Sequence, residues 1–144
     1  MKGKMKGSYI LIIKLPETQT ISFGKNKENV FKRGYYAYVG SAMNGIKNRI
    51  NYHLKKARNK KMHWHIDYLS RKGKIIDIFI KKNLMKEECK IAKSLNENLQ
   101  GISGFGSTDC SCKSHLFYSK KKEEIIKNTI KTGMEKYHLK LKDI

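Results

Sequence analysis

One acidic residue stands in a row of apolar ones. Residues 85–99 read as a helix, and at about 100° per residue its apolar side chains fall in one stripe. These residues are Leu84, Ile91, Ala92, Leu95 and Leu99. Glu88 lies at the centre of the stripe, whereas Glu87 lies about a quarter-turn away and is expected to be solvated. A carboxylate that faces a core must be paired, protonated or bound to a cation. We therefore expect Glu88 either to bind a metal ion in a cleft or to form a salt bridge with a lysine.

Arg49 and His53 lie one helical turn apart in a second predicted helix, residues 45–58. The apolar row beside them contains Ile46, Ile50 and Leu54. A guanidinium binds phosphate through two parallel hydrogen bonds, and an imidazole exchanges protons near neutral pH. The pair suits phosphate chemistry, but on its own it also fits the ordinary polar surface of a helix.

Two tyrosines occupy strand positions that can bring them together. Tyr9 opens the strand predicted for residues 8–15, and Tyr38 lies near the end of the strand predicted for residues 35–40, on the same face as Tyr36. If these strands are neighbours, the two phenols converge at one end of a sheet. The alternative is that each ring packs in the core and its hydroxyl bonds locally.

The remaining pattern predicts the scaffold. Further strands are expected at residues 18–24, 74–80 and 115–118, and further helices at 63–71 and 122–138. The strand at 18–24 is expected to form a hairpin with the first strand. The last helix is expected to carry Ile126, Ile130, Met134 and Tyr137 on one face. This order predicts an α+β (mixed α/β) fold, in which a small antiparallel or mixed central sheet is flanked by helices.

The composition favours a polyanionic partner. The 144 residues form one predicted domain, 1–144, and carry a net charge of +20. The chain contains 28 lysines and 4 arginines, so few of its cationic side chains offer the planar fork that binds phosphate through two hydrogen bonds. The alternative is a solvated basic surface that reflects lysine-rich composition. The longest apolar run, Ile10 to Ile13, is too short for a membrane span, and three cysteines do not indicate a disulfide framework. A cytoplasmic protein without membrane contact is expected.

Together these residues resemble the GIY-YIG nuclease superfamily. Gly7-Ser8-Tyr9 is similar to its first signature and Tyr38-Val39-Gly40 to its second, and Arg49, His53 and Glu88 follow in the same order. The resemblance covers about residues 7–100, and residues 101–144 would form a C-terminal strand-helix extension. The runs YAYVGSA, WHIDYL and GFGSTDCSCKSHLFY, with Glu88-Cys89, are similar to one prokaryotic branch of unknown function with many archaeal members.

The resemblance implies a role for each residue. Tyr9 would activate or orient the attacking water, with Tyr38 in support. Arg49 would hold the scissile phosphate, and His53 would be a partner of Tyr9 or of the phosphate. Glu88 would bind one divalent cation, Mg²⁺ or Mn²⁺.

The implied activity is metal-dependent hydrolysis of phosphodiester bonds, in DNA more than in RNA, and a protein partner is expected to contribute substrate specificity. The alternative is a non-catalytic or partner-dependent nucleic-acid-binding module. Ser8 stands where the superfamily has isoleucine, so its side chain should point away from the site. The hairpin expected at residues 18–24 would account for the wide spacing between the two signatures.

A group of cysteine and histidine residues allows a different metal. Cys110, Cys112 and His115 are close in sequence, and Cys89 is a possible fourth ligand for Zn²⁺. Their spacing is not a standard zinc-finger spacing, so the alternative is that buried thiols and a hydrogen-bonded histidine tie the tail to the core.

The segment around residue 65 carries other polar and aromatic candidates. Trp64, between His63 and His65, is expected to anchor its segment or to stack on bases. Asp67 is expected to pair with a lysine or with His63.

Overall fold

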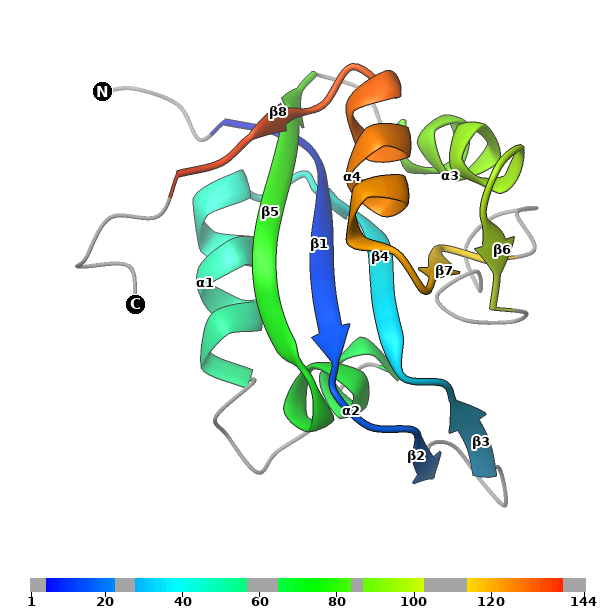
Figure 1. Ribbon diagram of the computed structural model, residues 1–144. Helices are drawn as coiled ribbons and strands as arrows, with labels where there is room; N and C mark the ends of the chain where they lie inside the picture. Colours follow the sequence, from blue (N-terminus) through cyan, green and yellow to red (C-terminus); the bar gives the residue numbers. More distant parts are fainter. Residues whose placement is uncertain (1–4, 23–27, 57–64, 84–86, 103–113, 139–144) are drawn as a thin grey trace.

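The computed structural model describes residues 5–22, 28–56, 65–83, 87–102 and 114–138. Its strands are β1 (Gly7–Leu15), β2 (Gln19–Ser22), β3 (Glu28–Phe31), β4 (Gly34–Ala42), β5 (Lys74–Lys82), β6 (Gln100–Gly101), β7 (Leu116–Ser119) and β8 (Glu135–Lys136). Its helices are α1 (Ile46–Lys56), α2 (His65–Lys72), α3 (Glu88–Asn96) and α4 (Lys122–Lys131). Figure 1 shows β1, β4 and β5 side by side at the centre.

The main sheet has the strand order β6-β7-β4-β1-β5-β8, and its neighbouring strands pair antiparallel. β1 lies between β4 and β5, and all of its residues except Lys14 are buried. This position explains its nearly continuous apolar sequence, because a strand covered on both faces buries both sets of alternating side chains. The predicted α+β class is confirmed.

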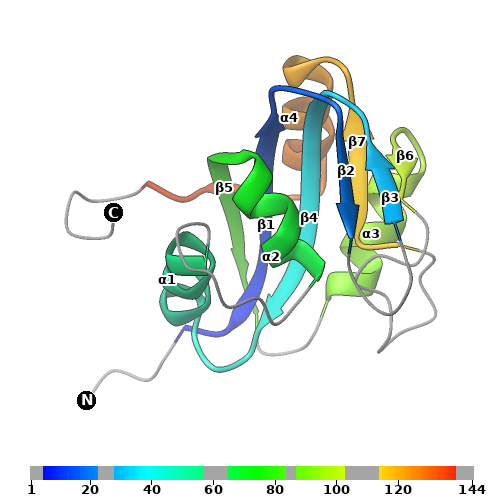
Figure 2. The same cartoon turned by 90° about the horizontal axis from the view of Figure 1, so that it is seen from below.

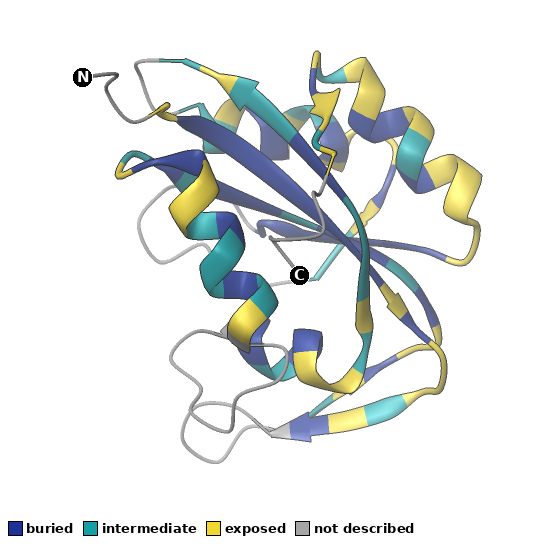
Figure 3. Cartoon of the chain, turned by 90° about the vertical axis from the view of Figure 1, so that its left-hand side faces the viewer, coloured by how far each residue is buried: buried dark blue, intermediate teal, exposed yellow. Residues whose placement is uncertain are grey.

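Helices cover both faces of the sheet (Figure 2). One core contains Leu11 and Ile13 of β1 together with Ile46 and Ile50 of α1, and α2 packs on the same side. The other core contains Ile10 and Ile12 of β1 and the buried side chains of α3 and α4. Figure 3 shows buried residues along the central strands and exposed residues on the outer surfaces of the helices. Among the described residues, no helix combines the length and apolar character needed to cross a bilayer.

The second strand pairs differently from the prediction. β2 pairs with β3 in a separate two-stranded sheet, with Gln19 opposite Phe31 and Ser22 opposite Glu28, and does not form a hairpin with β1. Pro16 follows the end of β1 and lacks the N–H that a continued ladder would need. The backbone N–H of Arg33 donates to Thr18 Oγ1 at 3.1 Å, which fixes the base of this small hairpin.

The last helix is shorter than predicted and presents a different face. α4 ends at Lys131, and Gly133 follows with a positive φ of 85°, a conformation that glycine adopts without strain. Its buried residues are Ile125, Asn128 and Thr129, whereas Ile130 is 55% exposed. Met134 is buried but follows the helix, as does Tyr137. The predicted apolar row was therefore wrong, because the buried row starts one residue before Ile126.

Candidate active site

Tyr9 and Tyr38 meet on the face of the sheet that α1 covers. Tyr9 lies opposite Gly40 in the β1–β4 register, and Tyr38 lies opposite Leu11. The two tyrosines are thus diagonal neighbours on one face, and their ring centroids are 6.4 Å apart. Tyr36 lies farther along the same face, as predicted. The structure therefore brings the two signature tyrosines together. Ser8 alternates with Tyr9, so it points to the opposite face, as expected, and is fully buried there.

Gly40 provides the space that the Tyr9 ring occupies. A Cβ atom at position 40 would overlap the outer ring carbons and the hydroxyl oxygen of Tyr9. Gly40 of the second signature is thus required because a larger residue would leave no room for the ring of Tyr9 in the first signature. The ring lies across the backbone of β4, and this packing sets the direction of its hydroxyl.

His53 holds the Tyr9 hydroxyl from the helix side. Its Nε2 lies 2.6 Å from Tyr9 Oη, and the imidazole also contacts the Tyr38 ring at a centroid distance of 6.1 Å. His53 lies three residues after Ile50, on the buried side of α1, and is 1% exposed. The predicted contact between His53 and Tyr9 is present. In the tautomer with its proton on Nδ1, the imidazole accepts a hydrogen bond from the phenol.

Burial favours the neutral form of each group in this cluster. It lowers the pKa of His53 to about 4, and the Arg49 charge contributes in the same direction. Burial raises the pKa of Tyr9 well above 10 and also raises the pKa of Tyr38. Near neutral pH the site therefore holds an imidazole and two phenols without net charge. A nearby positive charge would favour the ionised form of the Tyr9 phenol.

Arg49 and Glu88 place opposite charges around the two phenols. The positive charge of Arg49 acts to lower the pKa of both Tyr9 and Tyr38, and the negative charge of Glu88 acts to raise both. For Tyr38, Glu88 is the largest influence after burial. Tyr9, Tyr38 and His53 are thus in contact with each other, and Arg49 of α1 and Glu88 of α3 act on the two phenols electrostatically.

Glu88 contacts the residue that precedes β7. β7 begins at Leu116, opposite Tyr38, and the Val39 N–H donates to the His115 carbonyl at 2.9 Å. Glu88 is the first residue of α3, and its Oε2 lies 3.9 Å from His115 Nδ1. Its side chain is 20% exposed, so it lines a surface and is not enclosed in the core.

Glu87 was expected to be solvated but has polar partners. It lies 3.5 Å from Lys81 Nζ and accepts a hydrogen bond of 2.9 Å from Asn83 Nδ2. Glu88 has a histidine, not the alternative lysine, as its described ionic neighbour. Helix α3 spans Glu88–Asn96, whereas residues 85–99 were predicted. Leu84 lies outside the described residues, and the other apolar residues of the predicted stripe, Ile91, Ala92, Leu95 and Leu99, are all buried.

Two carboxylates act on the phenols, and Glu88 is the partly exposed one, whereas Asp67 is fully buried. The described residues contain no group of three or more histidine, cysteine or acidic residues arranged to hold a metal ion. Mg²⁺ fits such a site, because it keeps several waters and needs only one or two carboxylates besides substrate phosphate. Glu88 is accordingly the residue that would hold Mg²⁺ or Mn²⁺.

The alternative zinc ligands are only partly described. Cys89 Sγ lies 3.9 Å from His115 Nε2. Cys110 and Cys112 lie outside the described residues, as do His63 and Trp64. The contact between Cys89 and His115 also fits the alternative, in which a thiol and an imidazole tie β7 to α3.

Sequence reasoning missed one polar link behind the site. The Tyr52 hydroxyl donates to Asp67 Oδ2 at 3.0 Å, which joins α1 to α2, and the Tyr52 ring contacts His53. Asp67 is fully buried and bonds to Tyr52, and His63, one of its two expected partners, lies outside the described residues. Asp67 lies between apolar residues of α2. Like Glu88, it is an acidic residue on an apolar helix face, and this pattern could have indicated a buried polar partner.

The buried imidazole predicts an acid-labile fold. Because the pKa of His53 falls from 6.5 to about 4 on folding, the unfolded chain binds more protons in this window. The contribution is present above pH 6.5 and is lost as the pH falls toward 4. We expect the free energy of unfolding to drop by about 2 kcal/mol more in the wild type than in His53→Gln between pH 7 and pH 4.5. Urea titrations at the two pH values measure this difference, and equal drops would contradict it.

The family comparison covers almost the whole chain. The profile described as "Domain of unknown function DUF123" matches residues 8–138. The chain belongs to the DUF123 family. The match begins at the residue before Tyr9 and continues through β7, α4 and β8, so in this DUF123 chain it includes both the predicted core and the C-terminal extension. No curated protein and no solved structure gave a match.

Proposed function

We propose that this DUF123 protein is a metal-dependent endonuclease of the GIY-YIG type that hydrolyses phosphodiester bonds in DNA. The observation that carries the proposal is the convergence of Tyr9, Tyr38 and His53 on one face of the sheet, with Arg49 and Glu88 coupled to them. Four separate elements supply these five side chains. A cluster of phenols, an imidazole, a guanidinium and a carboxylate combines proton transfer with phosphate binding.

The residues divide the chemistry between them. Tyr9 orients a water molecule for attack, and His53 Nε2, 2.6 Å from the phenol oxygen, accepts the phenol proton as Tyr9 takes one from the water. Tyr38 packs beside both groups and keeps bulk water from them. The neutral resting state of His53 suits this role, since a protonated imidazole accepts no proton.

Arg49 and Glu88 supply the charges that the reaction needs. Arg49 holds the phosphate and offsets the negative charge that grows on it. Glu88 would hold a divalent cation, which would supply positive charge to stabilise the leaving oxygen. The positive charge of Arg49 favours ionisation of the Tyr9 phenol, against the effect of burial.

The net charge of +20 supports a nucleic-acid substrate, because such a field attracts polyanions over a long range. We propose DNA over RNA on the superfamily resemblance. The cytoplasm remains the compartment that the sequence predicts. The second candidate is a non-catalytic or partner-dependent DNA-binding module. The low resting acidity of Tyr9 favours it, because without a cation the phenol stays protonated.

The test is a cleavage assay over substrate classes. Purified protein is incubated with supercoiled, linear, branched and single-stranded DNA and with structured RNA, in Mg²⁺, Mn²⁺ or EDTA. We expect products from at least one DNA form with either metal and none in EDTA, because the buried phenol needs the cation to ionise. Binding to every substrate without products in either metal would favour the binding module. Products in EDTA would contradict a metal-dependent reaction.

A further inference from the structure

A basic groove lies at the end of the sheet far from Tyr9. It is formed where β1 ends, β4 begins and β7 ends, and it encloses about 780 Å³. In Figure 1 this is the lower end of the sheet, near the connections to β2 and β3. Leu15 at the groove is six residues from Tyr9 along β1, which corresponds to about 20 Å. The groove is thus separate from the candidate active site.

The groove collects positive charge without compensating acids. Its cationic residues are Lys14, Lys32, Arg33 and Lys120, and none of the described residues lining it is acidic. All four side chains are exposed. Four cations around one concave surface repel each other, so a bound polyanion relieves an existing electrostatic cost. Arg33 is one of only four arginines in the chain and adds a planar fork suited to phosphate.

The backbone that carries Arg33 is held in place before any ligand arrives. Its N–H donates to Thr18 Oγ1 at 3.1 Å, and its carbonyl accepts a hydrogen bond of 2.6 Å from the Tyr118 hydroxyl. Gly34 has a φ of 149°, and a Cβ there would contact the Tyr118 ring and the Ser119 carbonyl. This packing fixes the point from which the Arg33 side chain leaves the surface, and so lowers the entropic cost of binding.

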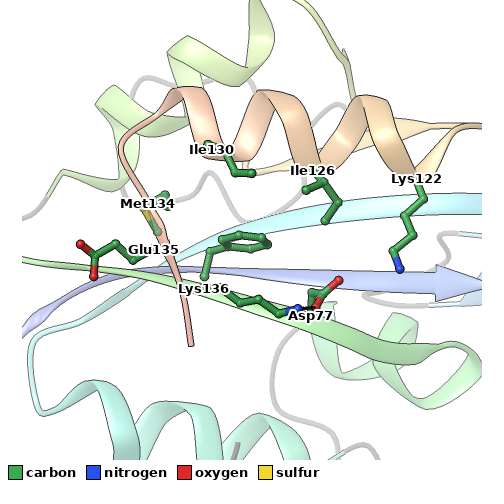
Figure 4. A pocket seen from close by; sticks show the side chains of 8 residues that line it. Asp77, Lys122, Ile126, Ile130, Met134, Glu135 and Lys136 are labelled. Carbon is green, nitrogen blue, oxygen red and sulfur yellow. Dashed lines mark ion pairs between the residues drawn. The ribbon is translucent and has the colours of Figure 1, made fainter. Parts of the chain in front are cut away.

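The groove beside α4 does not share this character (Figure 4). It lies between α4, β5 and β8, and Ile126 and Ile130 give it an apolar wall. Its charges balance, because Lys122 and Lys136 are matched by Asp77 and Glu135, and Lys136 Nζ lies 3.2 Å from Asp77 Oδ1. A polyanion has no electrostatic reason to occupy it.

We propose that the basic groove binds the phosphate backbone of the nucleic acid on one side of the cleavage point. The choice of nucleic acid over other polyanions rests on the proposed function, whereas the phosphate chemistry rests on the groove itself. At about 3.4 Å per nucleotide, the separation of about 20 Å between Tyr9 and Leu15 corresponds to about six nucleotides of backbone between the tyrosine cluster and the groove. The groove anchors the substrate, and the tyrosine cluster cleaves it.

Salt-dependent DNA binding tests the groove without any cleavage. Fluorescence anisotropy with a labelled 20-bp duplex in EDTA, from about 50 to about 200 mM NaCl, compares the wild type with the double variant Lys32→Gln/Arg33→Gln. The matched control is Lys127→Gln/Lys131→Gln, which removes two exposed charges from α4. Each lost phosphate contact lowers the slope of log K against log salt by about 0.9. We expect the slope of the groove variant to fall by about 1.8 and the slope of the control to stay within about 0.5 of the wild type.

The outcomes separate the groove from the proposed activity. Equal slopes and affinities for groove variant and wild type would overturn the groove, whether or not the protein cleaves DNA. The expected slope change in a protein that cleaves nothing would leave the groove standing and remove the nuclease proposal. Displacement of the duplex by inorganic phosphate at micromolar concentration would assign the groove to a small anion instead. Tighter Arg33-dependent binding to phosphatidylserine vesicles than to DNA would assign it to a membrane surface. Thermal melting confirms that both variants fold.

Discussion

Glu88→Gln is expected to lower metal-dependent cleavage by about 10³-fold or more while leaving DNA affinity within about threefold. The amide keeps the size of the side chain and its place at the start of α3, but it lacks the charge that a divalent cation requires. DNA affinity depends on the basic surface, so it does not need this carboxylate. Single-turnover cleavage in Mg²⁺ and anisotropy in EDTA measure the two quantities separately.

Glu87→Gln is the matched control for this experiment. It makes the same chemical change one residue earlier, at a carboxylate that contacts Lys81 and Asn83. We expect its cleavage rate to stay within about fivefold of the wild type. Cleavage that persists in Glu88→Gln would remove the metal-binding role. Equal losses in both variants would point to the structure of the α3 start and not to a metal ligand.

Gly40→Ala is expected to lower cleavage by about 10²-fold or more, as is Tyr9→Phe. The added methyl group overlaps the ring of Tyr9, so the ring must rotate away from β4 and its hydroxyl must leave His53 Nε2. Overpacking of this kind also costs about 1–3 kcal/mol of stability. Because Gly40 has no functional group of its own, a loss of activity reports the position of Tyr9.

A double-mutant comparison separates positioning from unfolding. If Gly40 acts through Tyr9, adding Gly40→Ala to Tyr9→Phe lowers cleavage little further, since both changes remove the same hydroxyl contact. Ser41→Ala is the control on the next residue of β4, whose side chain faces the other way. Full activity of Gly40→Ala at a temperature where it is folded would show that the ring position is not critical.

The central part of the fold could be predicted because its signals are local. β1 and β4 have alternating or continuous apolar residues, and the alternation alone places Tyr36 and Tyr38 on one face. The convergence of Tyr9 and Tyr38 then required only that the two strands be neighbours. The buried stripe of α3 was visible for the same reason, because 3.6-residue periodicity survives in the sequence.

The pairings between distant elements could not be predicted in this way. The partner of β2 depends on which chain segment lies beside it, and the apolar pattern of residues 19–22 fits β1 or β3 equally well. Asp67 was expected to pair with a lysine or with His63, and its contact with the Tyr52 hydroxyl, which follows from the packing of α1 on α2, was not predicted. In α4, Ile125 and Ile126 are adjacent, and which of the two side chains is buried depends on the rotation of the helix against β4.

The contact between Glu88 and His115 has a consequence for the order of events during synthesis. Tyr9 and His53 are 44 residues apart, and the strand that follows His115 pairs with β4 only after most of the chain exists. Such long-range pairings form late in folding, because closing large loops costs entropy before any contact repays it. A chain that ends before β7 lacks both the contact between Glu88 and His115 and the pairing of β7 with β4.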